Sequence, residues 1–431
     1  MPLSLIVRTL SSLKRFVREQ IAVPRLMAEW RRLSETNAAQ SVSGLVQRLV
    51  ILPADPHTLV GSKGDEAMMQ AVVACLAEKT SDLRVAIVTA SPGADAAAEA
   101  LGFEVLPIWR EPWRLEGVLR AIQSFGPDTL MVVGADIMDG HYSSIMALRM
   151  LATADLASRM GIRSTILGFS FNASPSKHLK PLFNQLSSEL VINIRDQISL
   201  QRFSLFCNAR KHLVTDAAFM LIPDNQSLRV REVVDWTQRR REAGDNVIAF
   251  NTHPLLIKPA DASKLRALTD SAVHALRDLM QRTKLSVVLL SHDYRGNNGD
   301  DVCLKVLYQQ LAPLFPARVL YPTEKKTASE LKAIAGLMDG VVTGRMHLAI
   351  ASLGMGVPVA AFTYQDKFQG LFDHFGLPDS LMLTPGGAMA SAKLLEMMND
   401  FMSHLGQLRT QVGHALPKVL EASKCNLKGL I

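Results

Sequence analysis

The sequence has few cysteines, no closely spaced cysteine pair and no long apolar run. Its cysteines, Cys75, Cys207, Cys303 and Cys425, lie far apart, which excludes a disulfide scaffold and a CxxC-type zinc site. No apolar stretch reaches the roughly 18–20 residues of a membrane-spanning helix. Arg8 interrupts the short apolar run at residues 3–7, so we find no clean signal peptide. We therefore expect a cytoplasmic protein in a reducing compartment, without a metal site.

Aromatic residues make up only 6% of the chain, although 48% of its residues are hydrophobic. Abundant aliphatic residues with few aromatic ones favour helices packed on a parallel sheet over an all-β fold. The modest charged fraction of 20% excludes extended disorder. The length of 431 residues exceeds the roughly 250–300 residues of a single core, which predicts two domains.

Positive charge is concentrated at the N-terminus. Residues 1–32 carry a net charge of +5, which leaves +2 for the rest of the chain and excludes a nucleic-acid binder. Apolar residues alternate with these cations at helical spacing, and Pro24 is expected to break or kink the helix. Two interpretations of this segment remain. It either contacts the anionic inner face of the cell membrane peripherally, or packs on the rest of the protein or on a partner. Under the first, residues 1–40 should be dispensable for folding.

From residue 48 onward, short β-branched runs alternate with amphipathic stretches. This rhythm predicts right-handed βαβ units and mostly parallel sheets. The predicted strands lie at 48–52, 83–89, 104–108, 129–133, 164–171, 190–194, 212–215, 246–250, 285–290, 318–321, 340–343 and 357–363. The predicted helices lie at 65–79, 95–101, 115–125, 262–282, 328–337, 346–353 and within 390–431, with another starting at Ser199.

The polar segment 222–246 interrupts this rhythm and predicts a passage between two α/β domains. We expect an N-terminal helix at 1–43, a Rossmann-like domain at 44–221, a linker at 222–246 and a second Rossmann-like domain at 247–385. Helices at 386–431 should pack back across the first domain. Ligands of such sheets bind beyond the carboxyl ends of the strands, so we expect a cleft built from the strand-end loops of both domains.

The loop after the first strand contains Gly61, Gly64, Asp65 and Glu66. Its small residues let a backbone approach a ligand, and the following helix offers free N–H groups. It is not a Walker loop, since no Gly-Lys-Ser/Thr sequence closes it. Asp65 either caps the helix, or Asp65 or Glu66 accepts a proton from a hydroxyl group.

Two further strand ends carry polar residues. Asp136 follows the strand at 129–133 and either binds a sugar or, with Asp139, shapes the loop. Arg195 follows the strand at 190–194, where it could bind an anion, form an ion pair with Asp196 or make a capping contact.

The segment from Thr343 to His347 is the most informative. A strand ends at Thr343 and Gly344, and the next helix carries Arg345 and His347 in its first turn. Cations are unfavourable at a helix N-terminus, so an anion should offset this cost. Arg345 offers a bidentate fork for carboxylate or phosphate, and His347 can transfer a proton near neutral pH. Lys367 adds a cation after the following strand.

These motifs resemble the polysaccharide pyruvyl transferase family across about residues 50–377. They are GSKGDEAMM from Gly61, the Gly134-Ala135-Asp136 turn, Ile194-Arg195-Asp196, Asp216-Ala217-Ala218 and TGRMHLAIASLGMGVPVAAFTYQDK from Thr343. The family commonly has a glycine run where Ala135 and Asp136 stand, and a proline where Ala217 stands. The resemblance implies a GT-B-like fold and the transfer of pyruvate from phosphoenolpyruvate to a sugar as a cyclic ketal.

The resemblance implies roles for the candidate residues. His347 would be the general acid and Asp65 the base. Arg345, Arg195, Lys367 and Gly344 would bind the donor, and Gly61, Gly64, Glu66 and Asp136 would lie on the acceptor side. The acceptor would be a glycan or lipid-linked oligosaccharide, and no cofactor would be needed.

Two alternatives remain. The first is a nucleotide-sugar glycosyltransferase of the same fold, but many such enzymes hold the donor sugar with a glutamate in the last strand–helix unit. No acidic residue lies between Thr343 and Tyr364, which favours a small anionic donor. The second is a non-catalytic exopolysaccharide-assembly protein, against which the Arg345/His347 pair argues.

Overall fold

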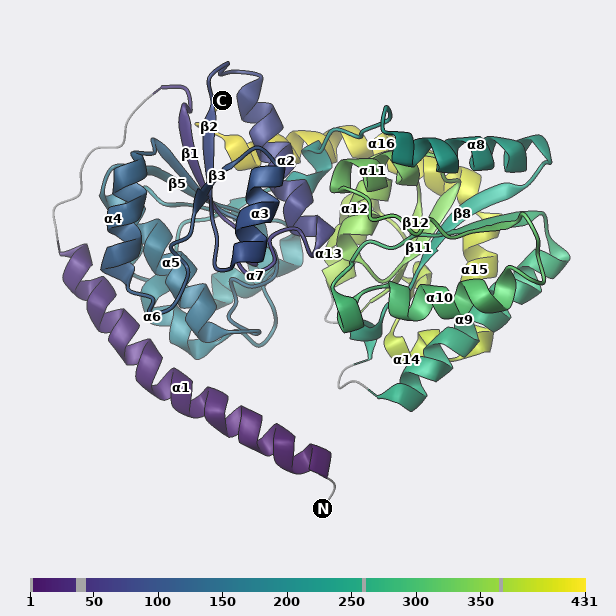
Figure 1. The fold of residues 1–431 in the computed structure, drawn as a ribbon, viewed down its shortest axis with the longest axis horizontal. Coiled ribbons are helices and arrows are strands. Elements are labelled where there is room, and N and C mark those ends of the chain that lie inside the picture. Colours follow the sequence, from purple (N-terminus) through teal and green to yellow (C-terminus); the bar gives the residue numbers. More distant parts are fainter. Residues whose placement is uncertain (1–2, 36–43, 258–260, 364–366) are drawn as a thin grey trace. The chain divides into compact units, whose positions relative to one another are not determined.

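The strands form two separate parallel sheets (Figure 1). This computed structural model describes residues 3–35, 44–257, 261–363 and 367–431, with side chains from residue 19 onward. The chain divides into two compact units. Unit 1 comprises Met1–Leu59, Cys75–Val214 and Asn426–Ile431, and unit 2 comprises Val60–Ala74 and Thr215–Cys425.

Unit 1 contains a seven-stranded sheet in its described residues, in the order β3-β2-β1-β4-β5-β6-β7. All paired strands are parallel, and most of their residues are buried, as expected of a sheet covered on both faces. The strand order reverses between β1 and β4, which creates a topological switch point. The strands are β1 (Arg48–Leu52), β2 (Arg84–Val88), β3 (Glu104–Leu106), β4 (Thr129–Val132), β5 (Arg163–Phe169), β6 (Val191–Ile194) and β7 (His212–Leu213).

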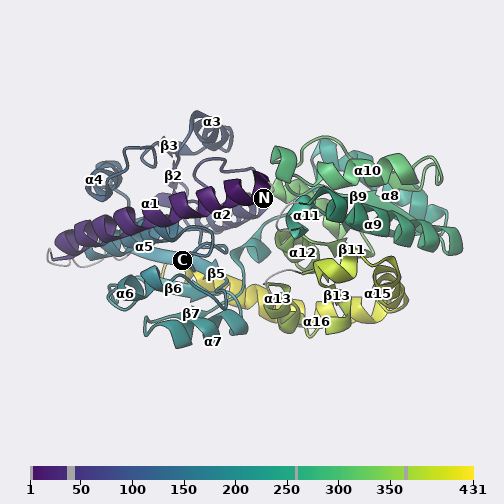
Figure 2. The same cartoon turned by 90° about the horizontal axis from the view of Figure 1, so that it is seen from below.

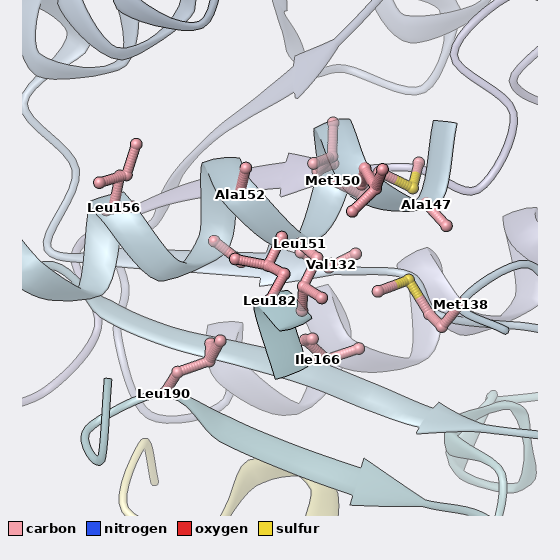
Figure 3. Packing of buried hydrophobic residues seen from close by; sticks show 14 of the residues in the cluster. Val132, Met138, Ala147, Met150, Leu151, Ala152, Leu156, Ile166, Leu182 and Leu190 are labelled. Atoms are coloured by element: carbon pink, nitrogen blue, oxygen red, sulfur yellow. The ribbon is translucent and has the colours of Figure 1, made fainter. Parts of the chain in front are cut away.

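The centre of unit 1 is helix α5 (Ser144–Arg159), which is buried along nearly its whole length. Figure 3 shows Leu151 of α5 close to Val132 of β4 and Ile166 of β5, while Met150 lies on another side of the helix. These fully buried side chains belong to one hydrophobic cluster that joins helices and sheet. The other helices that begin in this part of the chain are α1 (Leu3–Ser34), α2 (Lys63–Ala77), α3 (Pro92–Ala100), α4 (Leu115–Phe125), α6 (Lys180–Phe183) and α7 (Gln197–Phe206).

Helix α1 runs through Pro24 without interruption, so the expected break is wrong. Val23, Leu26, Met27 and Trp30 are buried, and the Trp30 indole donates to Asp155 of α5 at 2.8 Å. This packing along α5, visible in Figure 2, offsets the backbone hydrogen bond that proline removes. The C-terminal half of α1 is therefore part of the hydrophobic core, and we expect deletion of residues 1–40 to destabilise the protein rather than leave its folding intact.

The membrane interpretation of the N-terminus depends on Arg8, Lys14, Arg15 and Arg18, whose side chains lie outside the described residues. Further along α1, Arg25, Arg31 and Arg32 are exposed. Within the described part of the chain, no helix combines the length and apolar character that crossing a bilayer requires.

Unit 2 contains a six-stranded parallel sheet in its described residues, in the order β10-β9-β8-β11-β12-β13. Its strands are β8 (Asn246–Asn251), β9 (Leu285–Leu289), β10 (Val319–Leu320), β11 (Gly340–Thr343), β12 (Val359–Phe362) and β13 (Met382–Leu383). Its helices are α8 (Leu228–Glu242), α9 (Ala262–Arg282), α10 (Asp301–Leu311), α11 (Ala328–Gly336), α12 (Met346–Leu353), α13 (Lys367–Phe375), α14 (Pro385–Ala388), α15 (Ser391–Ser403) and α16 (Leu405–Lys424).

The units divide the chain differently from the expected domain ranges. Residues 228–242 of the expected linker form α8, which buries Val230, Val233 and Trp236 at helical spacing and belongs to unit 2. Residues 63–74 of α2 also belong to unit 2, where Glu66 accepts a hydrogen bond from the backbone N–H of Ala328 at 2.8 Å. The final residues belong to unit 1, where Asn426 accepts from the backbone of Gly168 at 2.8 Å.

Candidate active site

The turn between β11 and α12 lies at the carboxyl edge of the unit 2 sheet. Thr343 Oγ1 accepts from the Arg345 backbone at 2.9 Å, and the Gly344 carbonyl lies 3.0 Å from His253 Nε2. A Cβ atom on Gly344 would come within 2.8 Å of His253, so this turn requires glycine. Arg345 occupies the N-cap of α12, but its side chain does not cap the helix, which leaves the capping position to another group.

The guanidinium of Arg345 is held by two buried carboxylates. Its Nε donates to Asp300 Oδ1 at 2.8 Å, and Nη1 lies 3.0 Å from Asp293 Oδ2. Nη2 lies 2.6 Å from Asp300 and also donates to the Asn298 carbonyl at 3.0 Å. The anion expected beside the cationic N-terminus of α12 is therefore supplied by Asp293 and Asp300. The guanidinium fork of Arg345, which was expected to bind a ligand, is occupied by these carboxylates.

Burial raises the pKa of Asp300, while Arg345 acts in the opposite direction. Asp300 is fully buried and also accepts from Asn251 and from the His292 backbone, both at 2.7 Å. These contacts link the carboxyl ends of β8, β9 and β11.

His347 lies between α2 and the short helix η2 (Ala217–Met220). A Cβ atom on Gly64 would come within 2.1 Å of His347 Nδ1, so the ring packs directly on the glycine backbone. On its other side, Nε2 lies 3.6 Å from Asp216 Oδ2. The structure therefore places His347, the expected general acid, against Gly64, which was expected on the acceptor side of the site.

Helix α2 begins at Lys63, so Asp65 lies in its first turn and is not the N-cap. Asp65 is 7% exposed, and an isolated bridge pairs Ser62, next to Gly61, with Asp293. Glu66 is 1% exposed and binds the Lys63 ammonium at 2.6 Å in addition to the start of α11. Both carboxylate oxygens of Glu66 therefore hold the protein together rather than face an acceptor.

Replacing Gly64 by alanine should displace the His347 ring. Helix propensity alone would make this change stabilising by about 1 kcal/mol, but the added methyl group would overlap the imidazole. Because a displacement of about 1 Å can cost about 10²-fold in rate, we expect turnover to fall by at least tenfold with little loss of folding. Gly413→Ala in α16, where the new methyl group meets open space, is the matched control for turnover and thermal unfolding. Equal turnover in both variants would contradict this placement of His347.

His292 adds a fourth basic side chain to the cluster of Lys63, Arg345 and His347. It is 5% exposed and follows β9. Burial lowers its pKa well below the ordinary value, and His347, Arg345 and Lys63 lower it further. His292 is therefore neutral in the folded protein near pH 7.

This neutral histidine predicts a stability loss in acid. Below pH about 6.5 the unfolded chain protonates His292 while the folded protein does not, so the free energy of unfolding falls as pH falls. One proton corresponds to at most about 1.4 kcal/mol per pH unit. Urea unfolding at pH 7.5, 6.5 and 5.5 should show a steeper loss in the wild type than in His292→Asn. Parallel slopes would show that His292 is protonated in the folded protein.

The other candidates of unit 1 lie at the carboxyl edge of its own sheet. Arg195 is 3% exposed, and its Nε donates to Ser170 at 2.7 Å. Asp196 caps α7 by accepting from Ser199 N at 2.7 Å. Lys367, by contrast, is the first residue of α13 in unit 2 and is partly exposed, while Tyr364, Gln365 and Asp366 lie outside the described residues.

Asp139 and Asp136 both lie in the loop after β4, but their surroundings differ. Asp139 is 3% exposed and shapes the loop by accepting from the backbone of His141 and Asn172, while burial raises its pKa. Asp136 is half-buried and accepts from the Tyr142 hydroxyl at 3.3 Å. Ala135 has a φ of 45°, a conformation that favours glycine, which agrees with the glycines common in the related family at this position.

A cavity of about 850 Å³ lies in unit 1 near the switch point. The residues that line it come from α1, from α5 and from the loops after β1, β2, β3 and β4. They include Glu19, His57, Arg110, Glu111, Tyr142 and Arg149. The volume is within the range of small-molecule sites, and the lining combines a partly exposed aromatic ring with groups of both charges.

The sequence interpretation missed His292, Asp293 and Asp300, although it placed a strand just before them. Their position just after a predicted strand could have indicated them, because the carboxyl ends of parallel strands meet at one edge of the sheet. Among the described residues, no group of three or more His, Cys, Asp or Glu side chains has the arrangement of a metal site.

The two sheets place the protein in the GT-B structural class. The structure resembles a UDP-N-acetylglucosamine 2-epimerase with a TM-score of 0.55 and 10% identity, over 90% of this chain and 96% of that one. It also resembles the Neisseria meningitidis UDP-GlcNAc 2-epimerase (TM-score 0.54, 12% identity, 89% and 99% covered). A Rickettsia africae glycosyltransferase gives a TM-score of 0.53, 12% identity and 89% and 99% coverage. At such identities the likeness shows the fold, and the expected Rossmann-like pair is confirmed.

Residues 63–366 match the family model described as polysaccharide pyruvyl transferase. The chain belongs to the polysaccharide pyruvyl transferase family, as its motifs predicted. No curated protein sequence matches it.

Proposed function

We propose that the protein transfers pyruvate from phosphoenolpyruvate to a sugar of a cell-surface polysaccharide or its lipid-linked precursor, forming a ketal. Family membership supports pyruvyl transfer in general. The more specific proposal of ketal formation rests on the position of His347, which lies between Gly64 and Asp216 in the first turn of α12.

The reaction needs one acid and one base. Protonation of the methylene carbon of phosphoenolpyruvate makes its central carbon electrophilic, and one sugar hydroxyl adds there. The bond to the phosphate oxygen then breaks, and a second hydroxyl adds to the same carbon. Of the two hydroxyl protons, one replaces the proton given to the methylene carbon and the other leaves with phosphate. No cofactor enters this scheme.

His347 is the proposed general acid and Asp65, in the facing first turn of α2, the candidate base. For the donor charges we propose Lys367 together with the N-terminus of α12. Arg345 is committed to Asp293 and Asp300, so we assign it an indirect role: it shapes the turn that carries His347.

For the acceptor sugar we propose the cavity of unit 1. Tyr142 is 39% exposed and offers a ring face to a sugar, while Asp136 next to it offers a carboxylate to its hydroxyl groups. The contribution of Glu19 to this cavity brings the basic N-terminal helix close to the proposed acceptor site. A lipid-linked acceptor would fit this arrangement, with the helix contacting the anionic inner face of the membrane.

Phosphate release from phosphoenolpyruvate, measured with and without a lipid-linked glycan fraction, tests the proposal. We expect release that depends on the glycan, and mass spectrometry should show the pyruvate increment on it. Mass spectra of the surface polysaccharide from cells with and without the protein should differ by the same increment. Release of a nucleotide from a nucleotide sugar, with none from phosphoenolpyruvate, would instead identify a glycosyltransferase.

A further inference from the structure

Asp216 has a fixed orientation in unit 2. It is 3% exposed and is the N-cap of η2, where its Oδ1 accepts from the backbone of Ala218 at 2.9 Å. Its own carbonyl accepts from Ser423 of α16 at 2.7 Å. One carboxylate oxygen is therefore committed to the cap, and the direction of the other is determined.

The helix that Asp216 caps is itself immobilised. The Lys332 ammonium is buried and donates to the carbonyls of Phe219 at 2.8 Å and Leu221 at 2.6 Å. Thr215, just before Asp216, donates to the carbonyl of Val419 at 2.7 Å. Helices α11 and α16 thus hold η2 from both ends.

The second carboxylate oxygen, Oδ2, is directed at His347. It lies 3.6 Å from Nε2, which is buried and has no hydrogen-bond partner among the described residues. This separation is longer than a hydrogen bond, but such contacts in empty sites tighten when the substrate binds. The opposite edge of the ring, at Nδ1, lies against Gly64.

We infer that Asp216 is a positioning residue for His347. Its carboxylate holds the proton of Nε2, stabilises the ring when both nitrogens are protonated, and leaves Nδ1 as the atom that delivers a proton. A carboxylate that holds the second ring nitrogen fixes the tautomer and the orientation of an acid–base histidine in this way. The inference deepens the proposed function and rests on it for the identity of the reaction.

Asp216→Asn removes the carboxylate charge but keeps a side-chain oxygen that can cap η2. The asparagine oxygen can still accept from Ala218, while an amide N–H group replaces the acceptor that faces Nε2. We expect the thermal unfolding temperature to remain unchanged and turnover to fall about 10²-fold. Asp261→Asn, which changes the corresponding cap of α9, is the control that should alter neither turnover nor the state of His347.

Nitrogen NMR of the full-length protein with labelled histidine reads the inference directly. His347 is assigned by the signals lost in His347→Asn, and the neutral ring should carry its proton on Nε2 in the wild type. In Asp216→Asn the proton should move towards Nδ1. A wild-type ring protonated on Nδ1, or an unchanged tautomer in Asp216→Asn, would overturn the inference. If the tautomer shifts but phosphoenolpyruvate is not used, the proposed function fails while the pairing of Asp216 with His347 stands.

Discussion

His347→Asn should retain donor binding while turnover falls about 10²- to 10⁴-fold, the usual range for one acid–base group. Asparagine preserves some hydrogen bonding and similar bulk, so contacts with Gly64 and Asp216 persist in part. It cannot give up a proton in the working pH range. The measurement is donor affinity by calorimetry beside phosphate release from phosphoenolpyruvate.

The control is His414→Asn, which changes an exposed histidine of α16 and should leave both quantities unchanged. If affinity collapses together with turnover, His347 is mainly a binding residue. If both survive, His347 is structural, and the acid must be another group.

Arg345→Met should lower the free energy of unfolding by about 3–5 kcal/mol, the cost of removing one partner from a buried ion pair. Asp300 is fully buried and loses its compensating charge, whereas Asp293 keeps its ion pair with Arg295 at 2.6 Å. Urea unfolding measures the effect, and we expect turnover to fall as well because Arg345 forms the turn before His347.

Arg282→Met is the matched control, because it breaks a surface pair with Asp278 on α9. Such exposed pairs contribute less than about 1 kcal/mol. Adding Asp300→Asn to Arg345→Met should recover part of the stability, since it removes the buried charge that Arg345 no longer compensates. An Arg345→Met protein as stable as the Arg282→Met protein would show that Arg345 is free to bind a ligand.

Periodicity was sufficient for most of the fold. The helices at 115–125, 262–282 and 346–353 and the strand at 340–343 have the bounds that their patterns predict. Helix α5 was missed because it is buried on nearly all sides and has no polar face to set a helical period. Helix α8 was missed for the opposite reason, since its many charges concealed a narrow buried stripe.

The site could be predicted only in part. The turn at Thr343–His347 was identified from the strand-to-helix pattern, but its charge balance was not. Asp300 lies 45 residues before Arg345 in the sequence, and their pairing depends on side-chain directions that no local pattern encodes. The absence of acidic residues after Thr343 is therefore a weak argument for an anionic donor, because two aspartates reach Arg345 from the segment after β9.

The division of the chain has a practical consequence for dissecting the protein. The backbone passes from one unit to the other at four places, after Leu59, Ala74, Val214 and Cys425. A fragment that ends at residue 214 would carry the first turns of α2 without the α11 start that Glu66 binds, and would lack the Asn426 that binds Gly168. Cleavage at any single one of these connections leaves at least one product with residues of both units. Isolated units will therefore require either a redesigned chain order or co-expression of complementary fragments.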